Sequence, residues 1–518
     1  MSEAGSRTGP TAPMTGAALA VTAIALALGT FMQVLDGSIA NVSVPTIAGD
    51  LGVSADQGTW VITSFAVANG VSVPLTGWLM QRYGVVKTFV AAVSLFTVAS
   101  FLCGISWNLP SLIVFRILQG AVSGPMIPGS QALLISIFPA SRRGGALAIW
   151  SMTTLVAPIA GPVLGGYISD NMSWPWIFLI NLPVGAVCAL LCWRNMRSRE
   201  TATRKAPVDT TGFMLLLTWV GALQVMLDTG KDADWFNSPA IVVMAIVALI
   251  AFAAWLVWEL TEKDPIVDLS LFRSRNFTVG CIVTCLGFGV FFGNSVLLPL
   301  WLQTHMNYIA TWAGLVAAPS GVVAVLLTPF AAQVMGRIDA RWTATGAMAA
   351  FGLSFWLRSG YTPDASFGAL VVPMLVQGVA MSVFFVSMIT ITLNGIPMNR
   401  IPQATGLSNF TRLTAGGFAA ALTTTVWDRA ESLHQTRLAE TVGATDPAWL
   451  KAIGGLGHMG MTLPQSLSAL TRQFVDQAYL LASLDFFRAS AWIMFLLIPL
   501  LWFTKRASGG GGHVAAAD

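Results

Sequence analysis

Three charged side chains lie inside long apolar stretches of the sequence and are its best candidates for chemistry. They are Asp36, Arg116 and Arg412. A charge at the centre of a membrane-spanning helix costs about 2.5–3.5 kcal/mol on insertion scales, so such residues face a wet cavity or one another. Burial favours the neutral form of a carboxyl group. Asp36 is therefore predicted to bind and release a coupling proton; the alternative is a hydrated residue near the outer end of its helix.

The two arginines keep their charge at any working pH and cannot carry a proton cycle themselves. Arg116 is predicted to hold a neighbouring carboxylate ionised or to bind a carbonyl group, with structural capping of a neighbouring helix as the alternative. Arg412 could take part in coupling or gating, or could extend its side chain to the interface between membrane and water. Asn41 and Gln119 are further candidates for coupling or gating.

Two glycine-rich segments are candidates for moving parts. In one, Ala157, Gly161 and Gly165 are spaced four apart and form a smooth helix face, while prolines interrupt the backbone hydrogen bonding. This segment is predicted to act as a hinge or gate, with close packing alone as the alternative. The other is a turn that joins two apolar stretches and is predicted to be a cytoplasmic gating loop, with key residues Gly77, Arg82, Gly84 and Lys87.

The composition shows which elements must hold these residues. Hydrophobic residues make up 55% of the 518 residues and charged residues only 10%, against about 25% charged in a typical soluble domain. These values exclude a soluble enzyme and a disordered chain. The net charge of +4 is too small to indicate nucleic-acid binding. The chain also lacks a Gly-x4-Gly-Lys-Ser/Thr loop and any metal-binding motif, so no cofactor or metal is expected.

Apolar stretches of about 20 residues, the length of a spanning helix, recur along the whole chain. We predict an all-α polytopic membrane protein with fourteen spans and both termini in the cytoplasm, because most of the 27 basic residues lie in connections on the N-terminal side. The spans are expected near 17–40, 57–79, 86–106, 111–135, 145–168, 174–194, 209–228, 239–259, 276–300, 311–334, 342–358, 367–392, 404–427 and 486–504.

The chain also resembles itself at an offset of 258 residues. Gln119-Gly120 matches Gln377-Gly378, Arg142 matches Arg400, and Asp36 falls on Asn294. Repeated six-helix halves around a central pathway are a transporter architecture. The predicted organisation is a cytoplasmic N-terminus (1–16), an N-terminal six-helix bundle (17–195), a linker with two additional spans (196–275), a C-terminal six-helix bundle with a periplasmic loop at 428–485 (276–506), and a Gly-rich cytoplasmic tail (507–518).

Several motifs together resemble those of the major facilitator superfamily, and within it the 14-span drug:proton antiporter family. The motifs are Leu35-Asp36-Gly37-Ser38-Ile39-Ala40-Asn41-Val42, Gly58-Thr59-Trp60-Val61, Arg116 with Gln119-Gly120, Gly161-Pro162 with Gly165-Gly166 (the antiporter motif), Leu227-Asp228 with Asp234-Trp235-Phe236, and Ala310-Thr311-Trp312-Ala313-Gly314. One departure is Gln81, where the superfamily usually has an Asp. The charge relay associated with this loop is therefore expected to be weaker.

The resemblance implies a major facilitator fold in a bacterial inner membrane and proton-driven export of hydrophobic, structurally varied compounds. It also implies a tripartite pump with an EmrA-like periplasmic adaptor and a TolC-like outer-membrane channel. The periodic apolar residues of 463–487 predict an amphipathic helix that could dock the adaptor or lie on the membrane lipids. A proton-coupled importer, or an exporter of a specific lipid or metabolite, remains the alternative on the same scaffold.

The substrate pocket is expected to be apolar and adaptable, with Met and aromatic side chains in its walls. The candidates, chosen by their depth in the predicted spans, are Phe31, Met32, Trp60, Phe65, Phe291, Phe292, Asn294, Phe384 and Phe385.

Overall fold

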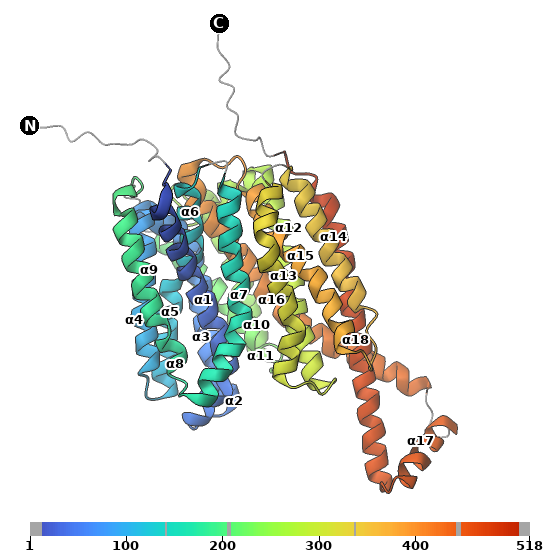
Figure 1. Cartoon of the computed structure of the whole chain (residues 1–518). Coiled ribbons are helices and arrows are strands. Elements are labelled where there is room, and N and C mark those ends of the chain that lie inside the picture. The colour runs from blue at the N-terminus through green and yellow to red at the C-terminus, as the bar shows by residue number, and fades with distance from the viewer. Residues whose placement is uncertain (1–12, 140–141, 205–208, 336–337, 442–446, 507–518) are drawn as a thin grey trace, which may run out of the picture.

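The computed structural model describes residues 13–139, 142–204, 209–335, 338–441 and 447–506, which form helices and short connections without strands. The predicted tail 507–518 and nearly all of the predicted segment 1–16 lie outside this part of the chain. Two bundles stand side by side, with the blue-to-cyan first half on one side and the yellow-to-red second half on the other (Figure 1). This is the all-α architecture that the composition predicts.

The N-terminal bundle contains six predicted spans, of which the fourth is broken at Gly124-Pro125. Its long helices pack around a core that includes Phe89, Phe96 and Trp150. The helices are α1 (Gly16–Asp50), α2 (Ala55–Gly58), α3 (Trp60–Tyr83), α4 (Val85–Gly104), α5 (Leu109–Ser123), α6 (Met126–Ile137), α7 (Arg143–Asn171), α8 (Trp176–Leu179) and α9 (Asn181–Met196).

The C-terminal bundle packs around a second core that includes Phe351, Phe355 and Phe384. Its helices are α12 (Arg275–Thr304), α13 (Ala310–Met335), α14 (Ala340–Arg358), α15 (Phe367–Thr392), α16 (Ile401–Thr441), α17 (Pro447–His458) and α18 (Leu463–Leu501). Short 3-10 turns occupy Arg197–Arg199, Trp235–Asn237, Leu269–Arg273 and Met398–Arg400.

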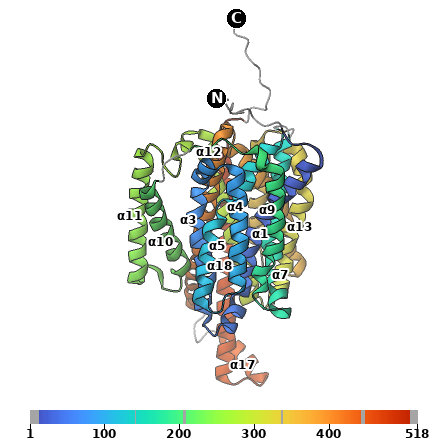
Figure 2. The same cartoon turned by 90° about the vertical axis from the view of Figure 1, so that its left-hand side faces the viewer.

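Two helices between the bundles, α10 (Thr210–Thr229) and α11 (Pro239–Thr261), form a hairpin that stands beside the twelve-span body (Figure 2). Trp219 of α10 packs on Trp255 of α11 and on Phe410 of α16, at ring-centroid distances of 5.5 and 5.7 Å. The outer face of α11 carries exposed apolar residues such as Leu249 and Ile250. This distribution is typical of a helix that faces lipid rather than a protein core.

Eleven helices in the described residues are long and apolar enough to cross a membrane. The other three predicted spans fall on α7, α14 and α16, which are 29, 19 and 41 residues long. The protein is therefore a multi-pass membrane protein, while the count of fourteen spans and the domain boundaries remain predictions.

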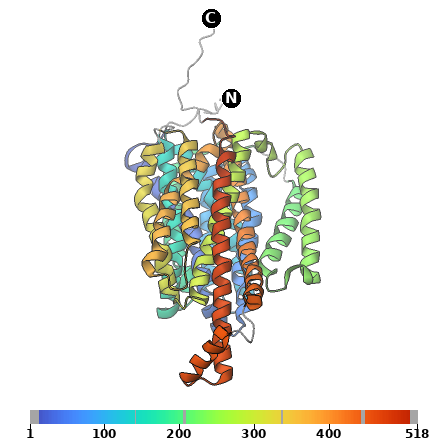
Figure 3. The same ribbon diagram turned by 90° about the vertical axis from the view of Figure 1, so that its right-hand side faces the viewer.

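The predicted outer loop 428–485 is mostly helical rather than irregular. Helix α16 continues without a break to Thr441, and α18 runs from Leu463 to Leu501 as one helix of 39 residues. The predicted amphipathic helix is thus the outer half of the last spanning helix. The outer ends of α16 and α18, with α17 between them, form a hairpin. This outer hairpin extends beyond the end of the bundles, away from the side where α1 begins and α18 ends (Figures 1 and 3). The outer part of α18 therefore continues along the spanning helix, and its contact with an adaptor or with the membrane surface remains a prediction.

The two bundles meet closely near the end where α1 begins. Gly77 of α3 lies against Gln403 of α16, where an added Cβ would be 2.8 Å from the Gln403 side chain. Asn409 donates a hydrogen bond across the interface to Gln131 at 2.9 Å. The bundles are therefore in contact on this side of the membrane.

The glycines of the 161–166 segment have different surroundings. A Cβ on Gly161 would overlap with the Ser38 side chain of α1, and one on Gly165 would lie 3.2 Å from the carbonyl oxygen of Ile39. A Cβ on Gly166 would meet nothing within 4 Å. The smooth face predicted for this helix is used for close contact with α1, and its role as a gate remains a prediction.

Replacing Gly161 with Ala should destabilise the protein by about 1–3 kcal/mol, because the added methyl group forces α1 and α7 apart. Gly166→Ala is the matched control and should be neutral or slightly stabilising, since alanine favours the helix and has open space there. Thermal unfolding in detergent would measure both. Equal melting temperatures for the two variants would show that the α1–α7 contact tolerates the extra volume.

Candidate functional site: a sealed ion pair and a central cavity

Asp36 and Arg116 form an ion pair inside the N-terminal bundle. The Arg116 Nη1 atom lies 2.7 Å from Asp36 Oδ2, and both side chains are 0% exposed. The guanidinium also donates through Nε to the carbonyl oxygen of Val61 at 2.9 Å. Arg116 thus contacts a carboxylate, as the coupling role predicts, and a backbone carbonyl of a neighbouring helix, as the structural alternative predicts. Asp36 is not the hydrated residue of the alternative interpretation.

Three neutral polar residues complete a network around this carboxylate. Asn181 of α9 and Gln119 of α5 donate to Asp36 Oδ1 at 2.7 and 3.1 Å. Both amides also donate to the hydroxyl group of Ser100 on α4, at 3.1 and 2.7 Å. Four helices therefore converge on one buried carboxylate. Gln119 was predicted from the sequence, but Asn181 and Ser100 were not, because their neutral side chains do not stand out within apolar stretches.

The local structure of α5 explains how Arg116 reaches this position. A capping box between Asn108 and Ser111 fixes the start of the helix. About three turns after the start of α5, Gly120 lets this helix approach α3 so closely that a Cβ there would lie 2.5 Å from the carbonyl oxygen of Phe65. The Phe65 ring covers the guanidinium at 4.2 Å from its centroid. Cation–π contact replaces part of the hydration that the buried charge has lost.

The C-terminal bundle carries a related arrangement without a carboxylate. Asn294, which corresponds to Asp36 in the repeat, donates to Ser490 at 2.9 Å. Gln377, which corresponds to Gln119, accepts a hydrogen bond from Arg358. Arg358, the last residue of α14, is 1% exposed and was not among the residues predicted for the site. Its position at the end of α14 hid its burial, because hydropathy cannot separate a loop arginine from one that turns back into the bundle.

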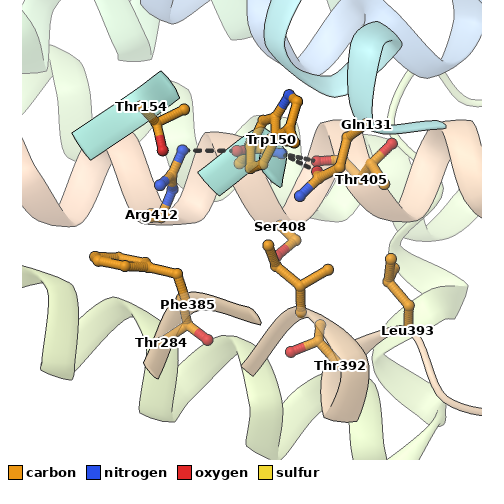
Figure 4. A pocket seen from close by; sticks show the side chains of 12 residues that line it. Gln131, Trp150, Thr154, Thr284, Phe385, Thr392, Leu393, Thr405, Ser408 and Arg412 are labelled. Carbon is orange, nitrogen blue, oxygen red and sulfur yellow. Dashed lines mark hydrogen bonds between the residues drawn. The ribbon is translucent and has the colours of Figure 1, made fainter. Parts of the chain in front are cut away.

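A cavity lies between the bundles, near the end where they touch (Figure 4). Its volume is about 30 Å³, enough for about two water molecules and far below the 300–1,000 Å³ typical of drug-sized pockets. A larger substrate therefore requires the bundles to separate. The lining residues are Gln131, Trp150, Thr154, Thr284, Phe385, Ile389, Thr392, Leu393, Thr405, Ser408, Asn409 and Arg412.

The residues predicted for the substrate pocket are spread over several environments. Phe385 lines the central cavity. The others lie elsewhere: Met32 and Phe384 are buried in the two cores, Phe31 and Phe291 pack against cores, Phe65 covers Arg116, Asn294 binds Ser490, and Trp60 and Phe292 are 41% and 36% exposed. Depth within a span did not indicate which helix face meets the pathway.

The two remaining candidates for coupling or gating, Arg412 and Asn41, lie in different parts of the structure. Arg412 lines the cavity, where it donates to Asn409 at 2.8 Å and lies 5.1 Å from the centroid of the Phe288 ring. Its side chain points into this cavity rather than toward the interface between membrane and water. Asn41 is exposed on α1 and is not part of the Asp36 network.

The predicted gating loop is held by a residue outside the motif. The Glu200 carboxylate, which follows α9, accepts the backbone N–H groups of Val86 and Lys87 at 3.0 and 2.9 Å and so caps α4. Gly84 has a φ of 94°, and a side chain there would overlap with Glu200. Arg82 contacts the Trp78 ring at 5.3 Å. Glu200 therefore supplies a carboxylate to a loop that has Gln81 in place of the usual Asp.

Comparisons with known proteins agree with this architecture. The family model "Major Facilitator Superfamily" matches residues 26–421. The chain is 46% identical to the multidrug export protein EmrB of Escherichia coli K12 (96% of this chain, 98% of that protein). It is 47% identical to the fatty acid resistance protein FarB of Neisseria gonorrhoeae (97% and 99%). The human organic anion transporter MFSD10 (TETRAN) has the same fold, with a TM-score of 0.56, 14% identity and coverage of 93% and 98%.

The chain therefore belongs to the major facilitator superfamily and is a membrane transporter.

Breaking the ion pair on one side should be costly. Arg116→Met should destabilise the protein by about 3–5 kcal/mol, because it leaves Asp36 buried without its counter-charge. The double variant Asp36→Leu/Arg116→Met should recover at least half of that loss. Thermal unfolding of the single and double variants measures this coupling. Additive losses in the double variant would mean that the two charges do not stabilise each other.

Glu200→Ala should destabilise the protein by about 1 kcal/mol, because it leaves the N–H groups of Val86 and Lys87 uncapped. Glu262→Ala is the control, since Glu262 accepts from the adjacent Lys263 N–H alone among the hydrogen bonds described. Hydrogen exchange at the start of α4 should accelerate in the first variant and not in the second. Unchanged exchange would show that Glu200 does not hold this loop.

Proposed function

We propose that the protein is a proton-driven exporter of hydrophobic toxic compounds in a bacterial inner membrane, with both termini in the cytoplasm. The observation that carries this proposal is the Asp36–Arg116 pair, a buried titratable group in one bundle of a two-bundle transporter. Similarity to EmrB over nearly the whole chain supports multidrug export, and the basic residues of the short connections support the orientation.

Proton exchange at Asp36 requires the network to open. The carboxylate accepts hydrogen bonds from Arg116, Gln119 and Asn181, so an incoming proton must displace at least one of these donors. When the bundles open to the outside, a proton reaches Asp36 and the guanidinium turns to another acceptor. When they open to the cytoplasm, the proton leaves and the pair reforms.

Helix α1 offers a physical connection between this site and the cavity. Trp150, which lines the cavity, donates to Thr30 of α1 at 3.1 Å and to Ser130 of α6 at 2.8 Å. Thr30 lies less than two turns before Asp36 on the same helix. A substrate that displaces Trp150 would therefore shift α1, and with it the carboxylate. This is the proposed path of coupling.

The driving force is sufficient for export without ATP. At a membrane potential of about 150 mV, one proton moving inward releases about 3.5 kcal/mol. Because a tenfold concentration ratio costs about 1.4 kcal/mol, one proton per neutral molecule sustains a gradient of about 300-fold.

The outer hairpin supports assembly with other proteins. Helix α17 and the ends of α16 and α18 stand clear of the bundle on the side opposite the start of α1 (Figure 3). Exposed apolar residues cluster near its tip, including Leu450, Met459 and Leu463. We propose that this hairpin contacts an EmrA-like adaptor, which would connect the transporter to a TolC-like channel.

A second candidate function is export of fatty acids or related lipids. It is favoured by the 47% identity to FarB, which is named for fatty acid resistance. The same bundles and the same proton site serve both candidates, so they differ in the substrate that enters the central cavity.

The test is proton movement in proteoliposomes that carry an imposed pH gradient, measured when a lipophilic drug is added. The parent protein should show drug-dependent proton flux, and Asp36→Asn should lose it, because an amide cannot bind and release the proton. Asp50→Asn is the matched control, since Asp50 is an exposed carboxyl on the same helix.

Equal flux in the parent and in Asp36→Asn would place the coupling proton on another group and leave Asp36 structural. Flux from fatty acids but not from drugs would favour the second candidate.

A further inference from the structure

Arg412 is a cation in the central cavity without an anionic partner. Its described contacts are the Asn409 side-chain oxygen at 2.8 Å and the Phe288 ring. None of the residues that line the cavity is acidic, and Arg412 is absent from the ion pairs of the described chain. By contrast, Arg116, which is fully buried, is paired with Asp36. A guanidinium in a water-poor site with no carboxylate nearby is a natural receptor for an anion.

Arg358 provides a comparison, because it is also buried but does not face the central cavity. Arg358 also has no carboxylate partner in the described residues, but it is enclosed by Ser354, Met374 and Gln377 and by two aromatic rings. It does not line the central cavity. Arg412 differs because it faces space that lies between the two moving bundles (Figure 4).

The rest of the cavity indicates what kind of anion would fit. Phe385, Ile389 and Leu393 provide an apolar wall, and Phe288 and Phe291 lie beside Phe385 at ring-centroid distances of 6.2 and 5.9 Å. A ligand that contacts both the Arg412 guanidinium and this apolar wall carries one negative group and an apolar body. A planar carboxylate matches the two-pronged donor geometry of arginine better than a spherical anion does.

We propose that Arg412 binds the carboxylate of lipophilic organic anions and makes them a substrate class of this transporter. This inference rests on the proposed export function. Arg412 acts here as a specificity-determining residue, while the proton site at Asp36 serves anionic and neutral substrates alike.

The hydrogen bonds around Arg412 also connect the ligand site to the contact between the two bundles. Arg412 donates to the oxygen of Asn409, and the nitrogen of Asn409 donates to Gln131 in the other bundle at 2.9 Å. A carboxylate that takes over the guanidinium releases the Asn409 amide. The released amide can turn and leave Gln131, which removes one of the contacts that hold the bundles together at this end. An anionic substrate thus loosens the closed interface as it binds.

The experiment compares binding of dodecanoate with that of dodecanol, its neutral counterpart, to the purified full-length protein in neutral-lipid nanodiscs. Arg412→Gln should weaken dodecanoate binding about tenfold or more, as expected for loss of a charged hydrogen-bond partner, and leave dodecanol binding unchanged. A second carboxylate with an aromatic body, 2-naphthoate, shows whether the site serves fatty acids or aromatic acids as well.

A second variant keeps the test decisive if Arg412→Gln is poorly folded. Asn409→Asp retains the arginine but places a carboxylate beside it, so it should also weaken dodecanoate binding and spare dodecanol. Arg358→Gln, outside the cavity, should change neither. Unaltered dodecanoate binding in both cavity variants would overturn the proposal. So would an equal loss of dodecanol binding, which would assign Arg412 a structural role.

Failure of the proposed export function would look different. Drug-dependent proton flux with a neutral drug, measured in the parent protein, tests export without reference to Arg412. Absence of that flux in the parent protein would count against proton-driven export, whereas the binding comparison would still decide whether Arg412 selects anions.

Discussion

The structure depends on the cost of burying one ion pair. Asp36 and Arg116 are completely shielded from water, and removing either partner would leave a charge in surroundings that cannot solvate it. Helices α1, α4, α5 and α9 are held together at this point because each contributes a hydrogen-bonding group to the pair or its neighbours. The same cost makes the pair suitable for coupling. In the proposed mechanism, a proton that neutralises Asp36 would change the stability of the contact among these helices and so link protonation to helix arrangement.

The two halves of the chain have diverged around this pair. The repeat places Asn294 and Gln377 where the first half has Asp36 and Gln119, and both remain buried and hydrogen-bonded. The second half therefore keeps a polar core but lacks the titratable group. Its unpaired arginine in the pathway, Arg412, provides charge for ligands instead. In this account the first bundle handles the proton, the second provides the selective cation, and the cavity between them is where their movements meet.

The sequence predicted the helical membrane architecture and singled out both residues of the central pair, since isolated charges stand out against apolar stretches. It could not identify Asn181 and Ser100, because neutral polar residues are common in such helices and their importance depends on which neighbour they face. The same limit applies to the pocket: of the residues chosen by depth, Phe385 reaches the cavity, while Phe384 next to it is buried in the core. Adjacent residues on a helix point about 100° apart. The depth of a residue in the membrane therefore does not show whether its side chain points to the cavity or to the core. Glu200 could not be predicted as a cap of α4 either, because 113 residues separate it from Lys87.

The long connection near the end of the chain shows a further limit. Polar residues suggested a loop after the thirteenth span, but α16 and α18 extend through it as continuous helices. Helix propensity does not stop at the membrane surface, and hydropathy reports where a segment is apolar rather than where a helix ends. The result is a largely helical projection instead of an irregular loop.

The central claim is that Asp36 changes its protonation state during transport and that substrate opposes this change. Infrared difference spectroscopy of the purified protein can test it directly, with the Asp36→Asn variant used to assign the carboxyl band. The account predicts a protonated-carboxyl band from Asp36 that grows as the pH is lowered and shrinks when substrate is added. An Asp36 that stays ionised over the whole range in which the protein is folded, with or without substrate, would contradict it and make the pair a purely structural element.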